Sequence, residues 1–184
     1  MGQKQTAQQY DRELAACKKT FVDKAGDYGT SWRVLRPVSI TDQILIKALR
    51  IRHIQETGEQ KIADRIDSEF CGIVNYGIIA LIQSEWPADT DWELPLEQAV
   101  KAYEQKAAAV RTLMLDKNHD YGEAWRQMSQ ASMVDLILSK LQRIRRILAQ
   151  DGKTRVSEGM ESNFADIVNY ALFALIRIRE TSNV

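Results

Sequence analysis

Two apolar segments, SEFCGIVNYGIIALI at residues 68–82 and SNFADIVNYALFALI at residues 162–176, are copies of one sequence. With the preceding residue included in each copy, 9 of 16 positions are identical. At the period of an α-helix each segment is apolar nearly all the way round, which is typical of a helix buried on every side. Neither segment alternates with the two-residue period of a strand. We therefore predict an all-α fold in which these two segments are the central helices.

The duplication extends over the whole chain. DYGTSWR begins at Asp27 and DYGEAWR begins at Asp120, and residues 27–54 are identical to residues 120–147 at 14 of 28 positions. The offset is 93 here and 94 at the apolar segments, because the second copy has one extra loop residue. The sequence thus predicts two pseudo-symmetric repeats packed into one helical bundle. We expect the first repeat, a connector and the second repeat at residues 1–84, 85–96 and 97–184.

Each repeat is expected to contain three helices. The first helix is predicted at residues 8–25 in one copy and 95–117 in the other. It ends before the glycine of the DYG phrase, a residue that commonly stops helices. The third helix contains the apolar segment and is predicted at residues 63–86 and 157–181.

The second helix of each repeat is predicted to begin at a Ser-x-x-Asp pattern. SITD ends at Asp42 and SMVD ends at Asp135, and both match a capping box, in which the serine caps the first turn. The helix is expected to end in the loops at Gly58 and Gly152.

Composition limits the classes of function. The chain has 25 Lys and Arg residues against 25 Asp and Glu residues, so general binding to nucleic acids is not expected. Cys17 and Cys71 are too few for a disulfide scaffold and lack metal-ligand spacing, so we expect two buried, reduced thiols. No apolar run is long enough for a membrane span, and the first residues lack the apolar part of a secretory signal. We therefore expect a cytoplasmic protein.

A lysine lies within the apolar stripe of each second helix. Lys47 in the first copy and Lys140 in the second fall among isoleucine and leucine residues at the helical period. Arg50 and Arg143 follow at the edge of the stripe. Burying an unpaired ammonium group is costly. Two interpretations stay open: the lysine snorkels or forms a structural ion pair, or it binds a phosphate or another ligand.

The third helix of the second repeat carries a polar strip on an otherwise apolar surface. Ser162, Asp166 and Asn169 fall on one side of this helix. The first copy retains the serine and the asparagine as Ser68 and Asn75, and it has a glycine in place of the aspartate. Polar groups on a buried helix need partners, so this strip indicates either a site or a structural network.

Acidic pairs precede this strip in both copies. Asp64 and Asp67 are three residues apart, as are Glu158 and Glu161, so each pair faces one direction on a helix. Such a pair could hold a hard cation such as Mg²⁺. The same spacing is also common on solvated helix faces, which is the more frequent case.

The DYG phrase places an acid and aromatic rings beside the start of the second helix. Asp27 and Asp120 could form ion pairs with the buried lysines or bind a ligand. The aromatic residues of the phrase could stack on a nucleotide base or belong to the core. These residues are Tyr28, Trp32, Tyr121 and Trp125.

The motifs together resemble those of a bacterial family of unknown function, DUF1599, also called nucleotide modification associated domain 1. The second copy carries them as Asp120-Tyr121-Gly122, Lys140, Arg143, Ile144, Ser162, Asp166, Asn169 and Tyr170. The first copy carries them as Asp27-Tyr28-Gly29, Lys47, Arg50, Ile51, Ser68, Asn75 and Tyr76. The resemblance covers both repeats, and the name of the family implies a link to nucleotide or base modification.

A more remote similarity is to the all-α nucleotide pyrophosphohydrolases of the MazG type. Those enzymes use acidic residues on two helices to hold Mg²⁺ against a triphosphate. This chain has Lys-x-x-Arg on its second helix where such enzymes have Glu-x-x-Glu, and Gly72 replaces the acid in the first copy. The comparison implies that the first repeat is a degenerate, structural partner.

Our leading hypothesis is a nucleotide-binding protein whose ligand is a nucleotide or another phosphate-bearing small molecule. Lys140 and Arg143 would bind phosphate, and Lys47 and Arg50 would be their weaker counterparts. The other expected ligand-binding residues are Asp120, Tyr121, Trp125, Ser162, Asn169, Asp27, Tyr28, Trp32, Ser68 and Asn75.

As an enzyme, the protein would hydrolyse a phosphoanhydride with Mg²⁺ bound by Glu158, Glu161 and Asp166, of which Asp166 and Glu161 would be catalytic. The alternative is a non-catalytic structural or interaction protein, in which the buried Lys, Asp and Asn side chains form an architectural network. A fused repeat could also replace a homodimer or form half of a larger homo-oligomer.

Overall fold

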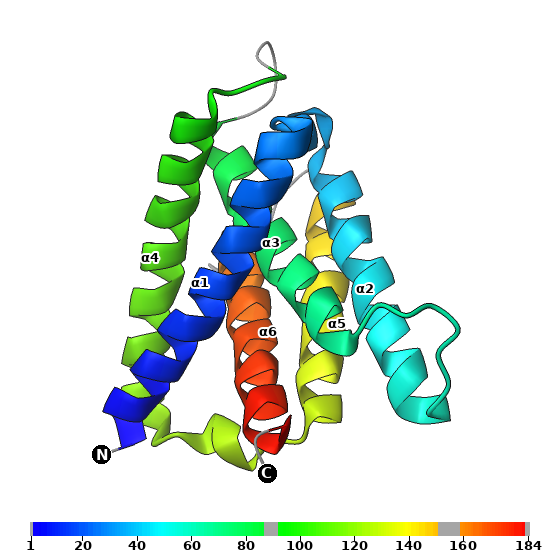
Figure 1. Cartoon of the computed structure of the whole chain (residues 1–184), viewed down its shortest axis with the longest axis vertical. Helices are drawn as coiled ribbons and strands as arrows, with labels where there is room; N and C mark the ends of the chain where they lie inside the picture. Colours follow the sequence, from blue (N-terminus) through cyan, green and yellow to red (C-terminus); the bar gives the residue numbers. More distant parts are fainter. Residues whose placement is uncertain (1, 87–91, 151–158, 183–184) are drawn as a thin grey trace.

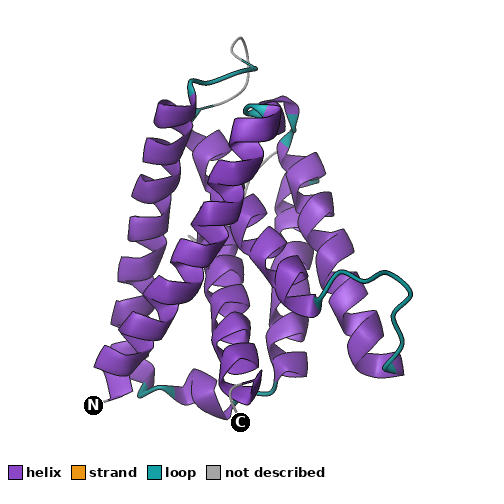
Figure 2. Cartoon of the chain, viewed as in Figure 1, coloured by secondary structure: helices purple, strands orange, loops and turns teal. Residues whose placement is uncertain are grey.

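The computed structural model describes residues 2–86, 92–150 and 159–182, and these residues form six α-helices, two short 3-10 helices and no strands (Figure 2). The all-α prediction is therefore confirmed. The α-helices of the first repeat are α1 (Gly2–Tyr28), α2 (Pro37–Thr57) and α3 (Ile66–Glu85). Those of the second repeat are α4 (Leu96–Tyr121), α5 (Gln130–Leu148) and α6 (Met160–Ser182). The 3-10 helices are η1 (Ser31–Val34) and η2 (Ala124–Gln127).

The two apolar segments form the central helices, α3 and α6. Figure 1 shows them between the α1/α4 pair and the α2/α5 pair, and α3 and α6 also share the most extensive helix–helix interface. A Cβ atom at Gly77 would lie 2.6 Å from Cγ2 of Val168, so the missing side chain allows the two helices to approach closely. No helix in the described ranges combines the length and apolar character needed to cross a membrane.

Two buried hydrogen bonds join the repeats across a pseudo-twofold axis. The Tyr10 hydroxyl on α1 donates to Oδ1 of Asn169 on α6 over 2.7 Å. The Tyr103 hydroxyl on α4 donates to Oδ1 of Asn75 on α3 over 2.8 Å. Tyr10 is equivalent to Tyr103, and Asn75 to Asn169. Each first helix therefore packs on the third helix of the other repeat, as in the isologous interface of a homodimer.

The contact between α1 and α4 repeats this symmetry at the surface. Arg111 donates to Asp11, with Nε 2.5 Å from Oδ1, and Lys18 forms an ion pair with Glu104. An offset of 93 relates each acid to the other acid and each base to the other base. The two ion pairs are thus copies of one interaction made twice.

A third symmetric pair of interactions has its charges reversed. Arg179 of α6 lies 3.1 Å from the buried carboxylate of Glu13 on α1. The equivalent positions hold Glu85 on α3 and Lys106 on α4, which also form an ion pair. Acid and base have exchanged helices between the repeats, and the interaction is kept.

The start of α2 differs from the sequence prediction. The helix begins at Pro37 instead of near Asp42, and Arg36 is the N-cap residue. Proline suits the first helical position because its fixed φ matches the helix and its missing N–H has no partner there. Ser39 therefore lies inside the first turn, so the capping-box prediction at SITD was wrong. The αL conformation of Gly58 ends the helix, as expected.

The start of α5 differs in the same way. The helix begins at Gln130 instead of near Asp135. Ser129 is its N-cap, and the Ser129 hydroxyl accepts a hydrogen bond from the backbone N–H of Ser132 over 3.0 Å. A serine cap is present, but it precedes the SMVD pattern by three residues. The predicted end of this helix at Gly152 lies outside the described residues.

Candidate functional site

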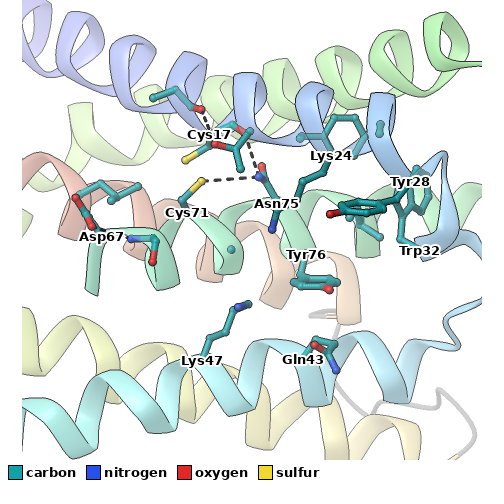
Figure 3. Close-up of a pocket in the computed structure, with 18 of the residues that line it drawn as sticks. Cys17, Lys24, Tyr28, Trp32, Gln43, Lys47, Asp67, Cys71, Asn75 and Tyr76 are labelled. Carbon is teal, nitrogen blue, oxygen red and sulfur yellow. Dashed lines mark hydrogen bonds between the residues drawn. The ribbon is translucent and has the colours of Figure 1, made fainter. Parts of the chain in front are cut away.

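A pocket of about 990 Å³ lies mainly in the first repeat, among α1, α2, α3 and the turn that contains η1 (Figure 3). Leu175 and Arg179 of α6 also line it. Its wall includes Tyr28, Trp32, Lys47, Ser68 and Asn75, which are predicted site residues. The pocket also has residues that sequence reasoning did not single out for a site, namely Lys24, Gln43, Cys71 and Tyr76.

Lys47 lines this pocket and forms an ion pair with Glu69 on α3. Its Nζ lies 3.1 Å from Oε2 of Glu69, whose carboxylate also accepts a hydrogen bond from Arg50. Arg50 donates in addition to the backbone carbonyl of Asp64 over 2.9 Å, which ties the α2–α3 loop to the pair. The predicted ligand groups Lys47 and Arg50 therefore share one largely buried carboxylate.

Gly72 makes this path possible. A Cβ atom at Gly72 would lie 2.7 Å from Cε of Lys47 and 2.9 Å from its Cδ. Contacts that short do not occur between real atoms, so any side chain at this position would displace Lys47. The glycine is thus the reason that the lysine stem can lie against α3 in the first repeat.

The second repeat pairs its lysines with a different acid. Lys140 Nζ lies 2.7 Å from Oδ2 of Asp166, and Lys117 Nζ lies 2.6 Å from Oδ1 of the same carboxylate. Burial raises the pKa of the Asp166 carboxyl, but hydrogen bonds from the two lysines outweigh it, so the net pKa lies below the ordinary value. Asp166 is therefore a carboxylate held between two ammonium groups.

This arrangement does not fit the expected Mg²⁺ site. Both oxygens of Asp166 accept from lysines, and two ammonium groups repel a divalent cation. Glu161 is exposed at the start of α6, and Glu158 lies outside the described residues. In the part of the chain that the structure describes, no three His, Cys, Asp or Glu side chains are grouped as metal ligands.

The acidic and phenolic groups of the DYG phrase lie on the surface. Asp27 and Asp120 are exposed, and Asp120 lies 3.2 Å from Nδ1 of His119. Of the two alternatives for these acids, ion pairs with Lys47 and Lys140 are not formed, because each lysine instead reaches the acid on the adjacent third helix. Tyr28 and Tyr121 are 70% and 71% exposed, so their rings are accessible to a ligand.

The two tryptophans of the phrase are core residues. Trp125 stacks on Phe173 with ring centroids 4.4 Å apart and an interplanar angle of 6°, and Arg126 Cζ lies 4.4 Å from the indole centroid. Trp32 packs against Phe21 at 6.2 Å. Both indoles are buried, and only Trp32 is at the wall of the pocket described above.

The sequence did not predict a role for the arginine at the end of the DYG phrase, which is Arg33 in the first copy and Arg126 in the second. Arg126 donates from Nη2 to the Thr6 hydroxyl over 2.7 Å and from Nη1 to Glu180 over 2.9 Å, so it joins α1, η2 and α6. The equivalent Arg33 donates to the backbone carbonyl of Trp86 over 2.5 Å. The signal was present, since this arginine is identical in both copies of the phrase.

The asparagines of the predicted polar strip join the repeats. Asn169 accepts from Tyr10, and Asn75 accepts from Tyr103 and also donates to the backbone carbonyl of Cys17 over 3.0 Å. The serines lie nearer the start of the same helices. Ser68 donates to the backbone carbonyl of Arg65 over 2.7 Å, and Ser162 is half-buried.

Nucleotide modification associated domain 1 (DUF1599) is the family whose model matches this chain, at residues 24–84 and 117–178. Together these two segments cover more than half of the sequence. The chain belongs to this family. No curated protein and no solved structure matches it. The name of the family links the protein to nucleotide modification.

The two DUF1599 segments begin at equivalent lysines, Lys24 and Lys117. Each segment therefore contains one lysine at the end of the first helix and the lysine of the second helix. It also contains nearly all of the third helix. Sequence reasoning missed Lys24 and Lys117, although the pair Asp-Lys is identical in the two copies at these positions.

The DUF1599 pocket also brings together the two cysteines. Cys17 on α1 is buried and Cys71 on α3 is half-buried, and both are free thiols at the pocket wall (Figure 3). A hydrogen bond with Cys17 lowers the pKa of Cys71 to about 7, and the same contact, with burial, raises the pKa of Cys17. Their proximity could not be read from a spacing of 54 residues (71 − 17).

Proposed function

We propose that this protein binds a nucleotide in the pocket of the first repeat. The observation that carries the proposal is the position of the pocket, whose wall contains the residues of the family motif from all three helices of that repeat. Its volume of about 990 Å³ is at the upper end of the usual range for small-molecule sites, which leaves room for a base, a sugar and phosphate.

The exposed ring of Tyr28 supports binding of an aromatic base. Tyr28 on α1 and Tyr76 on α3 both line the pocket and lie on the same side of it in Figure 3. Stacking on such a ring is worth about 1–3 kcal/mol per base and tolerates any base, because every base has a π-face. Lys24 and Lys47 supply positive charge to the same pocket, which suits the phosphate of a nucleotide.

The second repeat takes the architectural role in this proposal. Lys140, the phosphate-binding residue expected from the sequence, is already neutralised by Asp166, and Trp125 already contacts Phe173 and Arg126. The alternative hypothesis of a structural Lys–Asp–Asn network thus applies to one half of the molecule, and the binding hypothesis applies to the other. Asp166 gives no support to a Mg²⁺-dependent hydrolase in the second repeat.

The test compares two tyrosines that differ in their repeat but not in their exposure. Binding of nucleoside mono-, di- and triphosphates, with and without Mg²⁺, is measured by thermal shift and calorimetry. We expect Tyr28→Ala to weaken binding about tenfold, and Tyr121→Ala to leave it unchanged. Failure of every nucleotide to stabilise the unaltered protein, or equal losses in the two variants, would contradict the proposal.

A further inference from the structure

The second repeat provides an internal template for an anion site. Lys117 and Lys140 each donate to one oxygen of the Asp166 carboxylate, at 2.6 and 2.7 Å. The equivalent lysines in the first repeat are Lys24 and Lys47. The chain has thus kept both lysines in both halves, although only the second half has an acid at the position of Asp166.

In the first repeat the stem of Lys47 lies where a side chain at the position of Asp166 would begin, and no acid is present there. Gly72 occupies the position equivalent to Asp166, and Lys24, Lys47 and Gly72 all line the pocket. Figure 3 shows Lys24 extending into the hollow from α1 and Lys47 from α2. Within the described ranges, Lys24 has no carboxylate at ion-pair distance.

We propose that a phosphate group of the bound nucleotide takes the place of the Asp166 carboxylate, beside Gly72 and bridging Lys24 and Lys47. This inference rests on the proposed nucleotide site and names its phosphate subsite. Two ammonium groups can each donate to a different oxygen of one phosphate, as Lys117 and Lys140 do to one carboxylate. In the second repeat, the Asp166 carboxylate therefore occupies the position that we assign to the phosphate in the first repeat.

Lys47 can leave Glu69 and bind the phosphate, because Glu69 has a second cationic partner. Glu69 is paired with both Lys47 and Arg50, so its charge stays compensated by Arg50 when Lys47 turns toward the phosphate. The distance from Lys47 to Glu69 is 3.1 Å, longer than the 2.7 Å from Lys140 to Asp166. In the second repeat, Lys140 reaches the carboxylate of Asp166, the residue equivalent to Gly72. A lysine at this position of the second helix can therefore reach an anion held at that place.

The central experiment measures binding of inorganic phosphate at low salt by calorimetry in Gly72→Asp and Gly72→Ala. A Cβ atom meets the flexible end of Lys47 in both variants, so both displace this lysine, and only aspartate supplies a competing carboxylate. We expect Gly72→Asp to weaken phosphate binding about tenfold or more, and Gly72→Ala to bind much more tightly than Gly72→Asp. Equal affinities in the two variants would overturn the inference.

A second comparison uses an exposed lysine, whose loss leaves the core intact. Lys24→Ala is expected to weaken phosphate binding about tenfold, whereas its counterpart Lys117→Ala is expected to bind phosphate like the unaltered protein. Equal losses in both variants would overturn the subsite.

Nucleosides separate this inference from the proposed function. If an uncharged nucleoside binds as tightly as its monophosphate, and Gly72→Asp affects neither, the nucleotide pocket stands and the phosphate subsite fails. If the monophosphate binds about tenfold more tightly than the nucleoside, and Gly72→Asp removes this difference, both are supported.

Discussion

Asp166 and Glu69 hold equivalent lysines from positions one helical turn apart. The residue equivalent to Asp166 is Gly72, and the residue equivalent to Glu69 is Asn163. Both acids are largely buried, with side chains 10% and 11% exposed. Each lysine therefore keeps a partner, as burial of an ammonium group requires, although the acid lies on a different turn of the third helix in each repeat.

The partnership of Asp166 predicts a dependence of stability on pH. Because its folded pKa lies below the unfolded value, the unfolded protein binds more protons between the two values, and stability rises with pH in this window. The contribution is fully present above about pH 4, the ordinary value of an Asp carboxyl, and is lost as the pH falls through the folded pKa.

Asp166→Asn is expected to destabilise the protein by about 2 kcal/mol at pH 7. It leaves Lys117 and Lys140 without a carboxylate, and both can partly reach water. Urea unfolding at a series of pH values should show the difference from the unaltered protein shrinking below about pH 4. A difference that does not change with pH would contradict the ion-pair assignment.

At the scale of elements, most of the DYG phrase serves to connect helices. Its glycine has positive φ and ends the first helix, its tryptophan enters the core, and its arginine holds the turn to neighbouring helices. The exposed tyrosine is the member that neither role explains. The identity of the phrase in both repeats therefore reflects one helix-turn-helix corner built twice.

The reversed ion pairs predict that charges can be exchanged between elements. Glu13→Lys should destabilise the protein, because it places a lysine against Arg179 at a buried position. Adding Arg179→Glu copies the Lys106–Glu85 arrangement of the other repeat. We expect the double variant to recover about 1–2 kcal/mol relative to Glu13→Lys alone. A double-mutant cycle by urea unfolding measures this coupling, and additive losses would contradict it.

At the scale of the whole molecule, the two repeats form one core. Each repeat places its first helix on the third helix of the other through the Tyr10–Asn169 and Tyr103–Asn75 hydrogen bonds. The α3/α6 interface, in which Gly77 lies against Val168, joins the two halves. The predicted boundaries at residues 1–84 and 97–184 thus mark duplicated sequence, while the packing unit contains both.

Separation of the repeats is therefore expected to unfold them. Fragments 1–86 and 92–184, expressed alone, would expose the buried faces of α3 and α6, and should lack stable helical structure. Mixed together, they should form a helical one-to-one complex, because each fragment supplies the missing partner of the other. Circular dichroism and size-exclusion chromatography measure both states, and a stable monomeric fragment would contradict the prediction.

The sequence by itself determined the helices, their central pair and the duplication. Apolar periodicity is local, so residues 68–82 and 162–176 could be recognised as buried helices without their partners. The start of α2 and α5 was less accessible, because Ser-x-x-Asp occurs inside a helix as readily as at its end, and Pro37 and Ser129 set the boundary.

Only the tertiary structure placed this pocket at the first repeat. The sequence showed Gly72 as the loss of an acid and favoured chemistry in the second copy. The folded chain places Asp166 between two lysines, whereas the stem of Lys47 lies against Gly72 and both of these residues line the pocket. The partner of a buried charge depends on how helices cross in space, and the spacing of residues along one helix does not contain this information.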